Sequence, residues 1–372
     1  MDQKRIIDEF KELVSIEVHS RDERAIADVL KEKLMALGLT VTEDKAGEVL
    51  GGNAGNLYAR LPGNTDGEPI LFSAHMDRVG NHGHIVPIVQ EAEGKIVSDG
   101  TSILAGDDIG GVTAILAMLR EVKEKQIPHG LIEVAFSVCE ETGVEGSRQY
   151  DFSQFRSKSA FVYDASGKAG TIVLAAPSKG RVTIRVHGVT AHAGNEPEKG
   201  LNALKVAADL IMHLPDGRLS PVSTANFSII EAGSATNVVC DLVTITGEQR
   251  SRDAKEYQQI SADIQAAADK ISEKYHTKIE VELHTLYHAF KLEETARPCV
   301  LAKEAAEAVG AAPFFKEGGG MDANHFNEHG IAAVGIGTGN FKCHTSEEYQ
   351  VIDDLVKCAK QAVEIVKLAA GK

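Results

Sequence analysis

Histidine and carboxylate side chains stand at the ends of several apolar runs in this 372-residue sequence. His75 and Asp77 end the run PILFSAHMD, and the two-residue period of a strand places both side chains on one side. One of them can bind a metal ion while the other acts beside it. A His-x-Asp pair alone is a weak signal, because many polar strand ends carry no site.

Two carboxylate pairs strengthen the indication of a site. Asp107 and Asp108 lie in ILAGDDIGGVTAIL, before a predicted helix. Helix capping explains one of these aspartates equally well, but it does not explain the pair. Glu140 and Glu141 directly follow LIEVAFSVC, where like charges repel each other unless a cation or a shared proton is present. A solvated loop is the alternative reading of the glutamate pair.

Two further residues complete the set. Asp164 ends the run SAFVYDAS, and His344 follows IAAVGIGTGNFKCH. Together these positions supply two imidazoles and several carboxylates, a donor set that suits zinc, cobalt or manganese and differs from a thiolate site. A pair of divalent metal ions is the simplest explanation.

The elements that must position these residues alternate between apolar runs and helical patterns from about Pro69 to Asp164. This alternation predicts an α/β fold with a mostly parallel sheet. In such sheets ligands bind beyond the carboxyl ends of the strands, which is where the candidate residues stand.

A second pattern interrupts the first. From about residue 177 to 290 the order is strand, helix, strand, strand, helix, strand, which predicts an inserted α+β domain of ferredoxin-like layout. Helical and strand patterns then resume to the end of the sequence. We therefore predict a catalytic domain of residues 1–176 and 291–372 and an inserted domain of residues 177–290.

Composition excludes several classes of protein. A formal net charge of -15 argues against a nucleic-acid partner, because such proteins usually carry basic patches. The longest apolar stretch, VTAILAML, is too short to cross a bilayer, and the N-terminal segment looks like an amphipathic helix and not a secretory signal. Five widely spaced cysteines without a CxxC pair indicate reduced thiols. We expect a cytoplasmic protein that binds neither nucleic acid nor membrane.

With these motifs assembled, the sequence resembles the co-catalytic metallopeptidases, which include peptidase T, carboxypeptidase G, succinyl-diaminopimelate desuccinylase and aminoacylases. The resemblance spans essentially the whole chain, and the stretch HIVPIVQEAEGKIVSDGTSILAGDD is most similar to the peptidase T branch. The motifs that carry it are SAHMD (73–77), GTSILAGDDIGG (100–111), CEETGVEGS (139–147), YDAS (163–166), HGVTAHAGNEPEKGLNA (187–203) and GIGTGNFKCHTSEE (335–348).

The resemblance implies a role for each ligand-type residue. His75 and Asp164 would hold one metal ion, Glu141 and His344 the other, and Asp107 would bridge both. Zinc is the first expectation for both ions, with cobalt or manganese as alternatives. Asp77 would orient the His75 ring and fix its tautomer.

The same resemblance implies the remaining catalytic and binding roles. Glu140 would be the general base, and His192 would stabilise the oxyanion, in relatives often from the partner subunit, which implies a homodimer. The inserted domain of residues 177–290 would then be a lid and dimerisation domain. Arg250 and Asn237 match positions that bind a substrate carboxylate, although Arg252 is close enough to compete for that role. The glycines of KEGGGMDANHF (316–326) match a loop beside the substrate.

Other features are set aside. His82 and His84 match no ligand position of the family, and the neighbouring Cys343 and His344 need not meet in space as a nucleophilic pair. The glycine run GIGTGN is followed by CHTSEE, where a dinucleotide site would need a helix.

The leading hypothesis is therefore a metallopeptidase of tripeptide aminopeptidase type that acts on short peptides. The nearest alternatives are a dipeptidase, a carboxypeptidase or an N-acyl amino acid deacylase with the same fold. A non-catalytic metal-binding protein would not need Glu140, and a nicotinamide-dependent oxidoreductase would depend on the glycine run alone.

Overall fold

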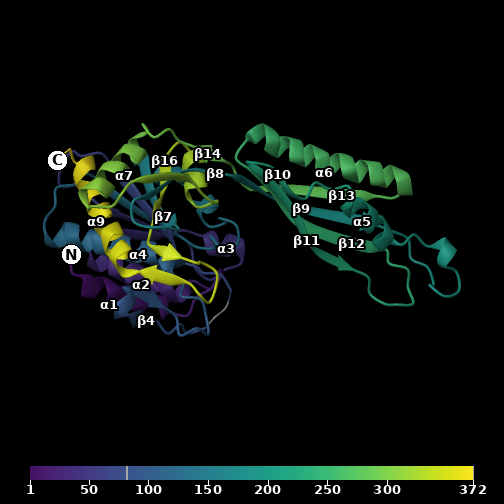
Figure 1. The fold of residues 1–372 in the computed structure, drawn as a ribbon, viewed down its shortest axis with the longest axis horizontal. Coiled ribbons are helices and arrows are strands. Elements are labelled where there is room, and N and C mark those ends of the chain that lie inside the picture. The colour runs from purple at the N-terminus through teal and green to yellow at the C-terminus, as the bar shows by residue number, and fades with distance from the viewer. Residues whose placement is uncertain (81–82, 372) are drawn as a thin grey trace. The chain divides into compact units, whose positions relative to one another are not determined.

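The computed structural model describes residues 1–80 and 83–371, and it divides into two compact units. Unit 1 consists of Met1–Ala176 together with Phe290–Lys372, and unit 2 consists of Pro177–Ala289. Both units are drawn in Figure 1. The predicted role of the inserted segment as a lid and dimerisation domain stays a prediction at this point.

The main sheet of unit 1 is mixed, with a parallel centre. Strands β6, β3, β7 and β16 pair in parallel in that order, and the outer strands pair mainly antiparallel. Every residue of β3 (ILFSAH) is buried, as expected for a parallel strand covered on both faces. The strands, in sheet order, are β1 (Thr40–Glu43), β2 (Leu57–Leu61), β6 (Ile132–Ser137), β3 (Ile70–His75), β7 (Ser159–Ala165), β16 (Ala332–Gly337), β8 (Thr171–Ala176) and β14 (Phe290–Lys291), with β15 (Phe314–Glu317) also paired to β8.

Two apolar cores cover the two faces of this sheet. Along β7, Phe161 and Tyr163 belong to the core shared with α1, α4, α7 and α9, whereas Ala160 and Val162 belong to the core shared with α8. Figure 1 shows α4 and α9 side by side on the first face. The helices are α1 (Gln3–Val14), α2 (Arg24–Ala36), α3 (Ala46–Leu50), α4 (Gly106–Glu124), α7 (Arg297–Ala308), α8 (Ala323–Glu328) and α9 (Ile352–Ala369).

A small antiparallel sheet lies within unit 1 in addition to the predicted architecture. Its strands pair in the order β17 (Asn340–Phe341), β18 (Tyr349–Val351), β5 (Lys95–Val97) and β4 (Ile88–Gln90). The segment between β17 and β18 contains His344. This sheet therefore fixes both ends of the segment that carries a predicted metal ligand.

Unit 2 has the predicted ferredoxin-like layout. Its antiparallel sheet runs β11, β12, β9, β13, with the short β10 added at the β11 edge. Side chains such as Val182, Ile184 and Val243 form a core with α5 and α6 on one face. The elements are β9 (Ser178–His187), α5 (Ala203–Ile211), β10 (Gly217–Ser220), β11 (Ser223–Ala232), β12 (Leu242–Ser251), α6 (Ala254–Tyr275) and β13 (Ile279–Tyr287). The predicted fold class is confirmed.

Candidate metal centre

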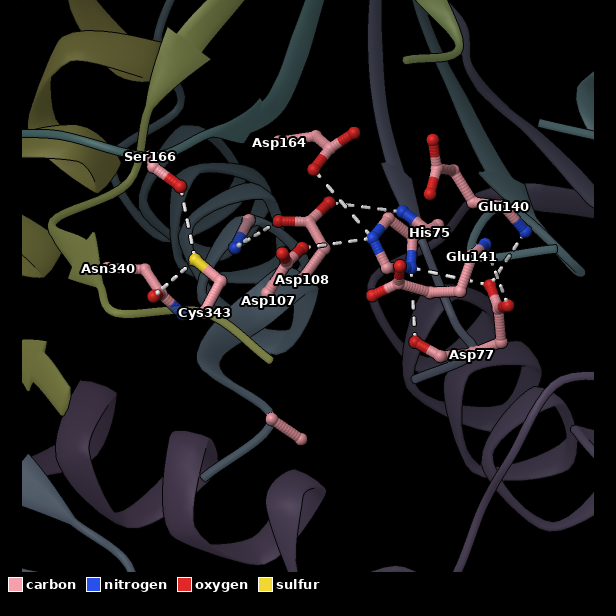
Figure 2. Close-up of polar contacts among 12 residues, drawn as sticks. His75, Asp77, Asp107, Asp108, Glu140, Glu141, Asp164, Ser166, Asn340 and Cys343 are labelled. Carbon is pink, nitrogen blue, oxygen red and sulfur yellow. Dashed lines mark hydrogen bonds and ion pairs between the residues drawn. The ribbon is translucent and has the colours of Figure 1, made fainter. Parts of the chain in front are cut away.

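His75 is the last residue of β3, and its ring is buried between carboxylates. Its Nδ1 lies 3.3 Å from Asp77 Oδ1 and 3.0 Å from the Asp77 carbonyl oxygen. Its Nε2 lies 3.1 Å from Asp107 Oδ1 and 3.7 Å from Asp164 Oδ1. Figure 2 shows Asp77 on one side of the ring and Asp107 and Asp164 on the other. With Nδ1 held by Asp77, Nε2 is the nitrogen that faces the other candidate ligands.

The neighbouring aspartates at the start of α4, Asp107 and Asp108, contact different partners. Asp108 accepts hydrogen bonds from the backbone N–H groups of His75 at 3.1 Å and Gly111 at 3.3 Å, so it caps the helix and holds the end of β3. Asp107 points its two oxygens at two imidazoles, with Oδ2 3.3 Å from His344 Nε2. Capping thus accounts for Asp108, and Asp107 alone takes the central position among the candidate ligands.

Asp77 also fixes the two glutamates that follow β6. Its Oδ1 accepts the Glu140 backbone N–H at 2.9 Å, and its Oδ2 accepts the Glu141 backbone N–H at 3.1 Å. Glu141 Oε1 then lies 3.1 Å from His344 Nε2. A single buried carboxylate therefore sets the orientation of His75 and the backbone position of both glutamates.

The ligand-type atoms form two overlapping groups. Oxygen and nitrogen atoms of His75, Asp107 and Glu141 lie within 4.8 Å of one another, as do those of His75, Glu140 and Asp164. Glu140 is thus close enough to belong to the second group itself. The structure brings all five predicted metal ligands and Glu140 to one place, at the ends of β3, β6 and β7, at the start of α4 and between β17 and β18.

The electrostatics of this cluster favour a bound cation. Burial raises the pKa of the Glu140, Glu141 and Asp164 carboxyl groups, because their charged forms lose solvation. Burial also acts on Asp107, but hydrogen bonds with His344 and His75 outweigh it and lower the pKa of Asp107. Four carboxyl groups and two imidazoles supply only oxygen and nitrogen donors, which fits divalent zinc, cobalt or manganese.

The surrounding carboxylates raise the pKa of both imidazoles. Hydrogen bonds to Asp107 and Glu141 raise the pKa of His344 to about 10. Burial lowers the pKa of His75, yet hydrogen bonds to Asp107 and Asp77 outweigh burial and raise it well above 6.5. A metal ion at this site would have to displace any proton on these ring nitrogens, because an imidazole binds a metal ion only in its neutral form.

The predicted binding residues of unit 2 lie at two separate ends of its sheet. His192 is exposed, and its neighbour Ala193 donates its backbone N–H to the Asn237 carbonyl at 3.0 Å. Arg250 lies near the far end of β12, where its Nε is 2.6 Å from Glu248 Oε1. β12 begins at Leu242. At roughly 3.3 Å per residue, Arg250 lies about 26 Å from that end of the strand. The nearby Arg252 donates to the Pro221 carbonyl at 3.2 Å.

The features set aside in the sequence have ordinary surroundings where the structure describes them. His84 is exposed, with Nδ1 2.9 Å from the Ser15 carbonyl, and His82 lies outside the described residues. Cys343 Sγ donates to Asn340 Oδ1 at 2.9 Å, and burial raises the pKa of this thiol, which opposes a nucleophilic role. The GIGTGN run leads into β17 and not into a helix.

Two residues in the surroundings of the site were missed from the sequence. Ser20 donates its hydroxyl to Asp77 Oδ2 at 2.6 Å, and Glu348 accepts the Asp107 backbone N–H at 3.1 Å. Ser20 follows no recognisable pattern, because it reaches the site from a loop 57 positions away. Glu348 stands in the quoted motif CHTSEE, so its closeness to His344 was the available signal.

Family models match two parts of the chain. The peptidase dimerisation domain matches residues 177–276, and peptidase family M28 matches residues 56–194.

In the part of the chain that the structure describes, no helix has the length and apolar content of a membrane span.

Related proteins match the whole chain. An uncharacterised Bacillus subtilis protein, YqjE, is 36% identical, with 100% of both chains covered. Among solved structures, aminopeptidase PepT from Bacillus cereus is 37% identical with a TM-score of 0.89, and 100% of each chain is covered. A tripeptidase from Staphylococcus aureus is 33% identical with a TM-score of 0.92, also with 100% of each chain covered.

Proposed function

Because the chain belongs to the co-catalytic metallopeptidase family that includes peptidase T, and is therefore a metallopeptidase, we propose that it acts on short peptides as a tripeptide aminopeptidase. The observation that carries the proposal is the geometry around Asp107. Its two carboxylate oxygens face two imidazoles, His75 and His344, and Glu140 lies beside them.

The donor set fits two divalent ions. His75 and Asp164 would hold one ion, Glu141 and His344 the other, with Asp107 between them, and zinc is the expected metal. When bound, these ions would polarise the scissile carbonyl and lower the pKa of a water molecule. This assignment leaves Glu140 without a metal to hold.

Glu140 has the properties of a general base. Its carboxyl group is buried, so burial raises its pKa towards the range in which a carboxylate accepts a proton readily. It would take the proton from the attacking water and deliver it to the leaving amine. Asp77 supports this step by holding the Glu140 backbone N–H.

The unit 2 residues act on the substrate in this proposal. His192 would stabilise the oxyanion, and Arg250 and Asn237 would bind the substrate carboxylate. Asn237 and Arg250 lie at opposite ends of β12, too far apart to contact one short peptide from the same subunit. This separation supports a homodimer in which the groups at one end come from the partner.

Exposed apolar residues of unit 2 also support a homodimer. Within the described residues, β10 pairs only with Ser223–Ala225, so the outer edge of β11 beyond that point has no neighbouring strand. Ile229 and Ile230 on this edge are 55% and 50% exposed, and Met212 after α5 is 82% exposed. An open edge with apolar side chains favours pairing with a second chain.

The test is hydrolysis of a free tripeptide by the purified protein before and after chelation, with zinc then restored. Activity should disappear on chelation, return with zinc and fall roughly 100- to 10,000-fold in Glu140→Gln. The variant should still bind two zinc ions, whereas loss of an ion would make Glu140 a ligand instead of a base.

A substrate panel separates the alternatives on the same fold. Peptides with a blocked N-terminus should survive an aminopeptidase, and dipeptides and tripeptides should differ in rate. Cleavage of acylated amino acids only, or release of C-terminal residues only, would replace the tripeptidase proposal with a deacylase or a carboxypeptidase.

A further inference from the structure

Glu348 is a buried carboxylate that joins two segments carrying candidate metal ligands. It is 1% exposed and lies four residues after His344, between β17 and β18. Its Oε2 accepts the backbone N–H groups of Leu104 and Ala105, each at 2.8 Å. Its Oε1 accepts the Asp107 backbone N–H at 3.1 Å and the side-chain amide of Asn340 at 2.8 Å.

These four donors come from two parts of the chain more than 230 residues apart in sequence. Leu104, Ala105 and Asp107 belong to the segment at the start of α4 that presents the Asp107 carboxylate. Asn340 belongs to the other segment, which presents His344. Glu348 therefore sets where one ligand segment stands relative to the other.

Gly106 leaves room for the Asn340 side chain between the two segments. A Cβ atom at Gly106 would lie 2.3 Å from Asn340 Nδ2, so a larger residue would displace the amide that donates to Glu348. Because a buried carboxylate costs free energy unless donors surround it, the four hydrogen bonds explain how Glu348 can be charged there. The same bonds make the position of its carboxylate specific.

We propose that Glu348 is a positioning residue that fixes the separation between the Asp107 carboxylate and the His344 imidazole. Through that separation it sets the affinity of the ion shared by Asp107, Glu141 and His344. This inference rests on the proposed function, since it assumes that these residues hold a metal ion. Glu348 itself faces the backbone donors and does not join the ligand set.

The proposal predicts a selective effect. Asp107 would contact both ions, whereas His344, in the segment that Glu348 joins to Asp107, would contact only one of them. His75 and Asp164, which would hold the other ion, belong to β3 and β7. A change at Glu348 should therefore weaken the ion at His344 more than the other. A residue with a merely structural role would lower thermal stability without separating the two affinities.

Glu133 offers a matched control. It is also buried, with an exposure of 0%, and it accepts the backbone N–H groups of Arg156 and Ser157 and the Tyr58 hydroxyl. It belongs to β6, and these three partners are not candidate ligands. Glu133→Gln thus removes the same kind of buried carboxylate away from the ligand segments.

The experiment titrates Co2+ into the metal-free wild type, Glu348→Gln and Glu133→Gln, with calorimetry and visible absorption of the bound cobalt as readouts. We expect two ions in the wild type and in Glu133→Gln. In Glu348→Gln one ion should bind about 10- to 100-fold more weakly, with an altered cobalt spectrum. Unchanged affinities and spectra in Glu348→Gln would overturn the inference, as would equal weakening in both variants.

The wild-type titration separates the two proposals. If the wild type binds fewer than two ions or cleaves no peptide, the proposed function fails before Glu348 is tested. If Glu348→Gln does not fold, Asn340→Ala replaces it, because that change removes one Glu348 donor and leaves the three backbone bonds. Selective weakening of one ion relative to the wild type then supports the inference. Affinities that match the wild type, or that fall equally for both ions, overturn it.

Discussion

Asp77 is the residue on which the geometry of the site depends most. Its carboxylate receives the Ser20 hydroxyl and the backbone N–H groups of Glu140 and Glu141, and it lies against His75 Nδ1. Burial works against its charge, but the interaction with His75 outweighs burial and lowers the pKa of Asp77. One side chain therefore orients His75 and fixes the backbone of both glutamates.

Asp77→Asn should weaken metal binding about 10- to 100-fold, because an amide has only one acceptor oxygen in place of the two of the carboxylate. Peptide hydrolysis should fall together with metal binding. Metal content after dialysis and the rate at saturating metal measure the effect. Asp44→Asn is the control, since Asp44 also accepts two backbone N–H groups, from Ala46 and Asn56, away from the ligands. Equal metal content in both variants would contradict the role given to Asp77.

Metal binding should release protons at pH 7. His344, with a pKa of about 10, and His75, with its raised pKa, are protonated in the metal-free protein, whereas an imidazole must be neutral to bind a metal ion. Affinity should therefore rise with pH through the neutral range.

Calorimetry in buffers of different ionisation enthalpy counts the released protons. We expect about two from the imidazoles, and about one fewer in His344→Gln. A binding enthalpy that does not depend on the buffer would show that the rings are already neutral.

The ligand-type residues could be predicted from sequence because each stands at the end of an apolar run or in a motif. His75, Glu141 and Asp164 end runs whose burial the strands confirm. The residue pattern alone did not distinguish Asp107 from Asp108, since both are good capping residues, and the choice of Asp107 as ligand came from the family resemblance. Their roles in the site stay predictions until the variants are measured.

At the scale of elements, the contact between α4 and β7 sets the position of Asp107. Gly111 lies on the face of α4 towards β7, and a Cβ atom there would lie 2.0 Å from the Tyr163 carbonyl oxygen and 2.5 Å from Asp108 Oδ1. The helix can therefore approach the strand closely only because residue 111 is glycine.

Gly111→Ala should lower the free energy of unfolding by about 3 kcal/mol, the upper end of the usual cost of overpacking. Chemical denaturation of the metal-free protein measures this change. Gly319→Ala is the control, because a Cβ atom at Gly319 meets no atom within 4 Å. A Gly111→Ala variant as stable as that control would mean that α4 can shift without cost.

The elements that sequence analysis missed are the short ones. Strands β4, β5, β17 and β18 span two or three residues each, too few to show the two-residue period of a strand. Their pairing depends on contacts between residues far apart in the chain, such as Tyr349 with Val97. Long strands and helices carry enough residues for their periodicity to be read.

At the scale of the whole molecule, the open edge of unit 2 is expected to hold the dimer together. Ile230→Lys would place a charge on the exposed edge of β11, and Met212→Lys would do so after α5. Both should shift the protein towards a monomer in sedimentation experiments.

Activity should fall with the dimer while metal content stays at the wild-type level, because the predicted ligands all belong to unit 1. Val49→Lys provides the control, since Val49 is 67% exposed in unit 1 and the change should leave the dimer intact. A fully active monomer would remove the partner's contribution from the mechanism.

Unit 1 is assembled from two separate stretches of the chain, and this has a consequence for biosynthesis. Domains generally fold as units, from the N-terminus onward, while the ribosome is still adding residues. When residue 176 has been added, the chain contains His75, Asp107, Glu140, Glu141 and Asp164, but His344 and Glu348 await at least a further 168 residues. By this order of synthesis, a growing chain cannot complete the proposed metal site, so we expect the nascent peptidase to stay inactive until β16 and the segment beyond it have joined the sheet.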